Sequence, residues 1–154
     1  MNYWLMKSEP NEFGIDDLRT NPGKTEPWDG VRNYQARNMM RDQMKVGDKA
    51  LFYHSACEVP GVVGVMKINS KPYADFTAFD PEDKHYDPKS DADNPRWFLV
   101  DVKYVKKLKR VIPLSELRQY QDRQLDGMVL LKRGNRLSIM PVSKEHFDFI
   151  LGLE

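Results

Sequence analysis

The sequence predicts an α+β, β-rich fold in which an open mixed β-barrel or curled sheet is surrounded by short helices. Two observations lead to this prediction. Most apolar segments alternate with a period of two residues, as half-buried strands do, and turn signals such as Pro60-Gly61 join them. The intervals between strands leave room for short helices only, which indicates hairpins rather than repeated strand–helix–strand units.

The bulk properties exclude several classes of protein. The chain of 154 residues is expected to form one domain, residues 1–154, and to bury roughly two-thirds of its unfolded surface. Its formal charge of +1, from 24 basic and 23 acidic side chains, predicts that any contact with nucleic acid is local. The single cysteine, Cys57, indicates a reducing compartment, and no signal peptide or membrane-spanning run is present. We expect no membrane partner and a cytoplasmic protein if the source is bacterial, or a nuclear one if it is eukaryotic.

The predicted elements follow from local patterns. Strands are expected over residues 3–9, 49–55, 62–68, 96–109 and 137–142, and helices over 15–19, 34–44, 113–117 and from 143 onward. The strand at 49–55 carries aromatic side chains on both faces and is predicted to be central, and Gly64 predicts a bulge. Residues 21–27 are expected to be loop. Residues 69–94, with six aspartates and one glutamate, are expected to form a long surface excursion with one helical turn near Phe76.

The stretch WDGVRNYQARN, residues 28–38, has more hydrogen-bonding capacity than a helix start needs. Gly30 can adopt a positive φ in a tight turn, and Asn33 is a good N-cap for the helix that follows. The free N–H groups of a helix start, two guanidinium groups and an indole ring suit a planar or anionic ligand, such as a base with its phosphate. The alternative is that Trp28 anchors the core and Arg32 is a structural ion-pair partner.

Polar side chains also end two of the predicted strands. Lys7, Ser8 and Glu9 follow the first strand, and Tyr53, His54 and Ser55 end the central strand. Strand ends often face a ligand crevice, although solvated termini and a purely structural histidine are the common alternatives. A row of lysines beginning at Lys103 could follow a nucleic-acid backbone, or simply solvate a sheet edge.

Catalytic and metal chemistry find little support in the sequence. His54 and Cys57 are spaced as a base and a thiol could be, but no third group orients them. The histidines and the cysteine lack the paired spacing of a zinc site, and no glycine-rich phosphate loop is present. We therefore predict no catalytic residue, no metal and no cofactor.

Several long motifs together resemble one known family. The runs YWLMKSEP, WDGVRNYQARNMMRD, GDKALFYHS, PGVVGV, PRWFLVDV and RLSIMPVS resemble the EVE domain family, in the family's order and over nearly the whole chain. The resemblance implies a PUA-like open barrel with a pocket of nucleobase size. Its implied base-contacting residues are Lys7, Ser8, Glu9, Trp28, Arg32, Asn33, Asn38, Tyr53, His54, Ser55 and Trp97. The local charges expected to meet phosphates are Arg32, Arg37 and Lys103.

The resemblance implies a nucleic-acid-binding module that recognises a modified base, with modified cytosine in DNA ahead of modified RNA bases. Trp28 or Tyr53 would stack on the base, and Glu9 would accept a hydrogen bond from an exocyclic amine. Stacking on an open pocket wall predicts that Trp28→Ala leaves the fold intact. The main alternative is a small hydrolase of modified nucleosides, as in related ASCH proteins, with Lys7 and Glu9 as acid and base. A weaker alternative is a protein-interaction domain that uses the acidic loop. A reader of this size would require a separate effector protein.

Overall fold

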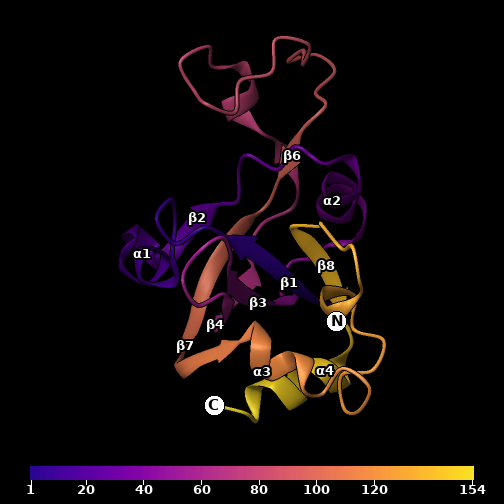
Figure 1. Cartoon of the computed structure of the whole chain (residues 1–154). Coiled ribbons are helices and arrows are strands. Elements are labelled where there is room, and N and C mark those ends of the chain that lie inside the picture. The colour runs from indigo at the N-terminus through magenta and orange to yellow at the C-terminus, as the bar shows by residue number, and fades with distance from the viewer.

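A six-stranded mixed sheet curls through the centre of the protein (Figure 1). The computed structural model describes residues 1–154. The strand order is β2-β7-β4-β3-β1-β8, and all neighbours are antiparallel except β1 and β3. The strands are β1 (Tyr3–Ser8), β2 (Thr25–Pro27), β3 (Lys49–His54), β4 (Gly61–Ile68), β7 (Asp101–Pro113) and β8 (Ile139–Val142). The predicted β-rich α+β class and the curled sheet are confirmed.

A second, two-stranded ribbon stands at one end of the sheet. It pairs β5 (Tyr73–Ala74) with β6 (Phe98–Leu99) and carries the long acidic excursion at the top of Figure 1. A 3-10 turn, η3 (Phe76–Phe79), opens that excursion, so the helical turn expected near Phe76 is confirmed. We call residues 80–94, which follow it, the flap.

The helices are short and lie around the sheet. They are α1 (Ile15–Thr20), η1 (Pro22–Lys24), α2 (Tyr34–Asn38), η2 (Met39–Gln43), α3 (Leu114–Arg118), η4 (Val129–Leu131) and α4 (Lys144–Leu151). None of them has the length and apolarity needed to cross a bilayer.

The two faces of the sheet support two hydrophobic clusters. Successive residues of β3 alternate between them, with Phe52 in one cluster and Leu51 and Tyr53 in the other. Both faces of β3 are therefore covered, and its place between β4 and β1 confirms the predicted central strand. The second cluster includes Phe147 and Ile150 of α4, so the terminal helix packs against the sheet as expected.

Local signals predicted several details correctly. The Asn33 side chain accepts a hydrogen bond from the Ala36 N–H at 2.9 Å and caps α2. Gly30 has φ of +80°. Register shifts flank Gly64, where an added Cβ would lie 2.6 Å from the Ile15 side chain and 2.8 Å from the Lys106 carbonyl oxygen. These contacts leave no room for a side chain at the bulge.

Three predicted elements are corrected. The helix expected over 34–44 stays α-helical only to Asn38 and continues as a π turn, in which the Met44 N–H bonds the Met39 carbonyl at 2.9 Å. Met39 and Met40 are both buried in this wider turn. In a straight α-helix, the side chains of two consecutive residues point about 100° apart around the helix axis, so they do not share one narrow face.

The other two corrections concern strands. The segment expected to be loop at 21–27 contains η1 and β2, a three-residue edge strand that tolerates Pro27 because its outer side needs no N–H donor. The strand expected over 96–109 is interrupted after β6, and β7 runs from Asp101 to Pro113.

Candidate functional site

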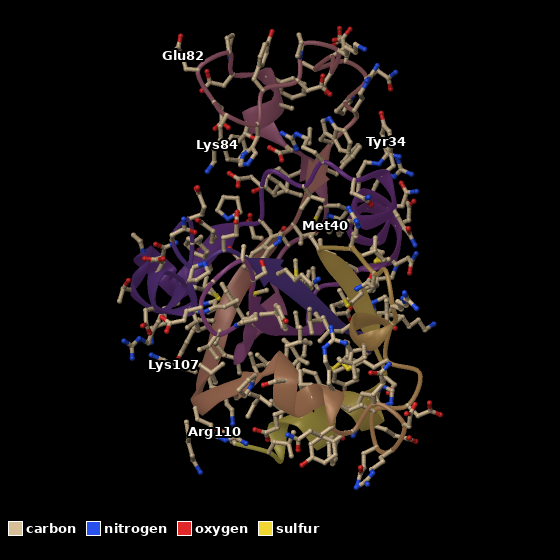
Figure 2. The ribbon with its side chains drawn as sticks, in the orientation of Figure 1. Tyr34, Met40, Glu82, Lys84, Lys107 and Arg110 are labelled. Atoms are coloured by element: carbon tan, nitrogen blue, oxygen red, sulfur yellow. The ribbon has the colours of Figure 1, made fainter.

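A cavity of about 1090 Å³ lies between the strand ends and the flap. Only five of its 21 lining residues are hydrophobic, so it suits a ligand that forms hydrogen bonds. Five segments line it: residues 7–13, 26–32, 55–56, 82–85 and 136–138. Figure 2 shows Glu82 and Lys84 on the flap, above the sheet.

The parallel pairing of β1 and β3 brings the two polar strand ends together. Ser8 is opposite His54 in the register, and the Ser55 N–H donates to the Ser8 carbonyl at 3.0 Å. On the other side of β1, the Lys7 N–H donates to the Ser138 carbonyl at 2.8 Å. Lys7, Ser8, Glu9 and Ser55 therefore line one cavity.

Lys7 is the cavity's half-buried cation. Burial lowers the pKa of its ammonium group, which makes no ion pair and lies 5.8 Å from the centroid of the Tyr53 ring. The neighbouring Ser8 hydroxyl is already used, because it donates to the Phe13 carbonyl at 2.7 Å. Lys7 is thus a donor that remains available to a ligand, whereas Ser8 holds the wall of the cavity.

Trp28 reaches the cavity from within the core. Its side chain is only 7% exposed, and its ring meets the edge of Phe52 with centroids 5.4 Å apart. The expectation of an open stacking platform that can be truncated without cost to the fold is therefore wrong. Trp28 is a core anchor with one edge in the cavity wall.

Two carboxyl groups in the cavity were not predicted. The pKa of Glu26 is raised mainly by burial and secondly by the negative charge of Asp29. The pKa of Asp29 is raised mainly by burial and secondly by the negative charge of Asp75. Glu26 is half-buried and Asp29 is exposed to solvent, and both carboxyl groups can accept a hydrogen bond from a donor on a ligand. No local sequence pattern around either residue indicated that it would line a cavity.

Arg32 is committed to holding the flap. Its guanidinium group lies 3.0 Å from the fully buried carboxylate of Asp75 and also donates to the His85 carbonyl at 2.6 Å and to the Thr77 hydroxyl at 3.2 Å. The Gly30 N–H donates to the same carboxylate at 2.8 Å. Burial alone would raise the pKa of Asp75, but the hydrogen bonds from Thr77, Gly30 and Arg32 lower it. Arg32 is therefore a structural ion-pair partner of Asp75, which was the alternative considered from the sequence.

A layered stack of aromatic rings and guanidinium groups continues the root of the flap. Tyr34 and Trp97 are stacked with centroids 4.8 Å apart, Arg32 lies 5.4 Å from the Trp97 centroid, and Arg37 lies 4.7 Å from that of Tyr34. The Trp97 indole N–H donates to Asp87 of the flap at 2.7 Å. The stack connects α2 with the flap, and neither Trp97 nor Arg37 lines the cavity.

The remaining predicted residues also lie outside the cavity lining. Asn33 caps α2, and the Asn38 side-chain oxygen accepts from Arg37 at 2.8 Å. Tyr53 is buried in the second cluster, and His54 Nε2 accepts from the Ile15 N–H at 3.1 Å. Lys103 lies within β7, opposite Thr25 of β2. Of the three expected phosphate contacts, only Arg32 borders the cavity.

Two lining segments, residues 82–85 and 136–138, were missed because they arrive from distant parts of the chain. His85 rests on Gly30, where an added Cβ would lie 2.5 Å from the imidazole ring. Phe13 and Leu137 supply apolar surface, and Arg136 supplies a cation. The one available signal was Gly30 itself, since a glycine at a tight approach predicts a partner but not its identity. No grouping of His, Cys, Asp and Glu side chains in the chain could hold a metal ion.

A curled, partly closed barrel with few short helices and a polar cavity at its strand ends is the architecture of PUA-like proteins. The EVE domain model matches residues 2–153, and the chain belongs to the EVE domain family. The resemblance seen in the sequence is thereby confirmed.

Similar proteins include one solved with DNA. The crystal structure of the human THYN1 protein in complex with 5-methylcytosine-containing DNA is 48% identical, with a TM-score of 0.94 over 99% of this chain and 97% of that one. A protein from Pseudomonas syringae is 46% identical, with a TM-score of 0.92 over 98% of both chains. Thymocyte nuclear protein 1 of Danio rerio is 51% identical over 98% of this chain and 71% of its own length.

Proposed function

We propose that this chain is a DNA-binding module that recognises a modified cytosine, and that the base occupies the cavity between the strand ends and the flap. The observation that carries the proposal is the human THYN1 protein, which has nearly the same fold and is crystallised with 5-methylcytosine-containing DNA. A base inside a duplex cannot reach such a cavity, so binding requires that the base leave the stack, at a cost of a few kcal/mol.

The chemistry of the cavity fits the edge of cytosine. The exocyclic N4 amine is a donor, and the cavity offers the carboxylates of Glu9, Glu26 and Asp29 as acceptors. The acceptor atoms of the ring require a donor, and the ammonium group of Lys7 makes no ion pair. Phe13 or Leu137 provides apolar surface for a 5-methyl group.

The test is a titration of the protein with three oligonucleotides of one sequence: duplex DNA with a single 5-methylcytosine, the unmodified duplex and the matching RNA duplex. We expect the methylated DNA to bind most tightly. Burial of one methyl group stabilises by about 0.8 kcal/mol, which corresponds to about a fourfold difference in Kd. Equal affinity for the methylated and unmethylated DNA would contradict the proposal.

A hydrolase remains the competing function, because the lowered pKa of Lys7 is also what a catalytic base requires. Incubation with a panel of modified nucleosides, followed by mass spectrometry, separates the two functions. A reader leaves every nucleoside unchanged. The appearance of a hydrolysed product would show that the protein is an enzyme and would contradict the proposed binding function.

A further inference from the structure

The cavity has a rim that differs in charge from one side to the other. The flap carries six acidic side chains against the two lysines Lys84 and Lys89, and Lys84 is paired with Glu12. Another part of the rim includes Arg136, which belongs to residues 132–136, Lys-Arg-Gly-Asn-Arg, a segment that we call the basic turn. It holds three cations and no acidic residue. A polyanion approaching the cavity is therefore repelled on one side and attracted on the other.

The cations of the basic turn are free, in contrast to Arg32 and Lys84, which line the cavity. Lys132, Arg133 and Arg136 are exposed, and none of them forms an ion pair or a side-chain hydrogen bond to the protein. The guanidinium group of Arg32, by comparison, is fully engaged with Asp75 and the His85 carbonyl. The free cations are those that could neutralise phosphates without breaking an existing contact.

The backbone fixes the basic turn beside the cavity. Gly134 has φ of +78°, and the Asn135 side chain accepts from the Leu137 N–H at 3.2 Å, so the turn has a defined shape. The pairing of β8 with β1, together with the Lys7 N–H to Ser138 carbonyl bond, holds its C-terminal end at the cavity wall. Arg136 itself lines the cavity.

We propose that the basic turn is the phosphate-binding segment of this protein, and that Arg133 and Arg136 contact the DNA backbone next to the base held in the cavity. The proposal rests on the proposed function and assigns to the basic turn the role that the sequence had given to Arg32, Arg37 and Lys103. Contacts of this kind position the duplex and carry no base information. Loss of these contacts therefore lowers affinity for methylated and unmethylated DNA by the same factor.

The test compares wild-type protein with the double variant Arg133→Gln/Arg136→Gln. Binding of the 5-methylcytosine duplex and of the unmodified duplex is measured at several salt concentrations. We expect the double variant to bind both duplexes on the order of tenfold more weakly at low salt, with an unchanged ratio between them. The slope of log K against log salt should fall in magnitude by about 0.9 for each lost phosphate contact.

The matched control is Arg118→Gln/Arg123→Gln, which removes two exposed, unpaired arginines at and after the end of α3, at the far end of the molecule in Figure 1. Its salt slope should equal that of the wild type. Circular dichroism melts of both double variants verify that each is folded.

Three outcomes separate the two proposals. A wild-type salt slope in the Arg133→Gln/Arg136→Gln variant overturns the basic turn as a phosphate contact. A changed ratio between the two duplexes also overturns it, since the turn would then shape the cavity. If wild-type protein itself fails to distinguish the duplexes, the proposed function is wrong, and the salt slope still decides whether the basic turn binds phosphate.

Discussion

At the scale of single residues, the largest side chains around the cavity serve the fold as well as the site. Trp28 is 7% exposed, meets Phe52 edge-on, and continues the β2–β7 pairing through its N–H, which donates to the Val100 carbonyl at 2.9 Å. Such a residue cannot be tested as a ligand contact by simple truncation. A loss of binding after truncation could result from the missing contact with the base or from destabilisation of the hydrophobic core, and the two effects would not be separated.

Trp28→Ala is predicted to destabilise the protein by about 3–5 kcal/mol, because it removes a buried aromatic side chain and leaves a hole beside Phe52. For a chain of this size the melting temperature should fall by about 10 °C or more, measured by circular dichroism. Trp28→Phe keeps part of the ring contact and serves as the control. An Ala variant that melts like the wild type would mean that the indole is not a core anchor.

His54 gives a prediction about pH. Burial lowers the pKa of its imidazole, and Nε2 accepts the Ile15 N–H at the start of α1, which requires the neutral ring. The unfolded histidine, with a pKa of about 6.5, takes up a proton first as the pH falls. The contribution of His54 to stability is therefore complete above about pH 6.5 and is lost as the pH falls through its lower folded pKa.

Urea unfolding of wild-type protein and His54→Phe between pH 7.5 and pH 5 measures this contribution. The free energy of unfolding of the wild type should decrease towards pH 5 more steeply than that of the variant. The difference between the two free energies therefore becomes smaller as the pH falls. Parallel curves would show that the pKa of His54 is the same in the folded and the unfolded protein, which would contradict the effect of burial.

At the scale of elements, the flap is anchored at its root by charge and aromatic stacking. Asp75 is fully buried and receives hydrogen bonds from Gly30, Arg32 and Thr77, and Trp97 is tied to Asp87. Beyond this root, the flap carries mostly exposed side chains. The flap is thus a polar wall of the cavity held by a few buried contacts.

Arg32→Gln is predicted to loosen the flap, because it leaves the buried carboxylate of Asp75 without its cation; removal of one partner of a buried pair costs about 3–5 kcal/mol. Hydrogen exchange followed by mass spectrometry should show faster exchange in residues 75–97. Exchange in β3 should be unaffected, and Arg41→Gln, which removes an exposed partner of Asp42, is the control. Equal protection of the flap in the Arg32→Gln variant and the wild type would contradict this role.

The same contacts show where prediction from sequence ends. Asn33 as a cap and Gly30 as a turn were predictable, because the physics of each lies within a few neighbouring residues. The pairing of Arg32 with Asp75 joins residues 43 apart in the chain, and no local pattern records it. Arg136 reaches the cavity only because β8 pairs with β1. The sequence therefore predicted the strand ends of the cavity but not the residues that complete it from a distance.

At the scale of the whole molecule, the formal charge of +1 is the sum of unevenly distributed charges, because an acidic flap and a basic turn both contribute residues to one cavity. This polarity would orient a duplex so that its backbone follows the basic turn while the flap faces the extruded base. It also predicts a modest salt dependence, since few free cations border the cavity. A slope implying on the order of ten released counterions would be too steep for such a surface.

The central claim is that one modified base is recognised inside the cavity, and a variant that fills the cavity tests it most directly. Ser55 lines the cavity at the end of β3, and its side chain lies outside both hydrophobic clusters. Ser55→Trp would place an indole where the base is proposed to bind, and Ser115→Trp, at an exposed position in α3, is the matched control.

The measurement is the ratio of Kd values for unmethylated and methylated duplex DNA in the wild type and in both Trp variants, with melting temperatures recorded alongside. We predict that Ser55→Trp lowers this ratio to one while the melting temperature stays near that of the wild type, and that Ser115→Trp changes neither. A folded Ser55→Trp protein that still prefers the methylated duplex by the wild-type factor would contradict recognition in the cavity.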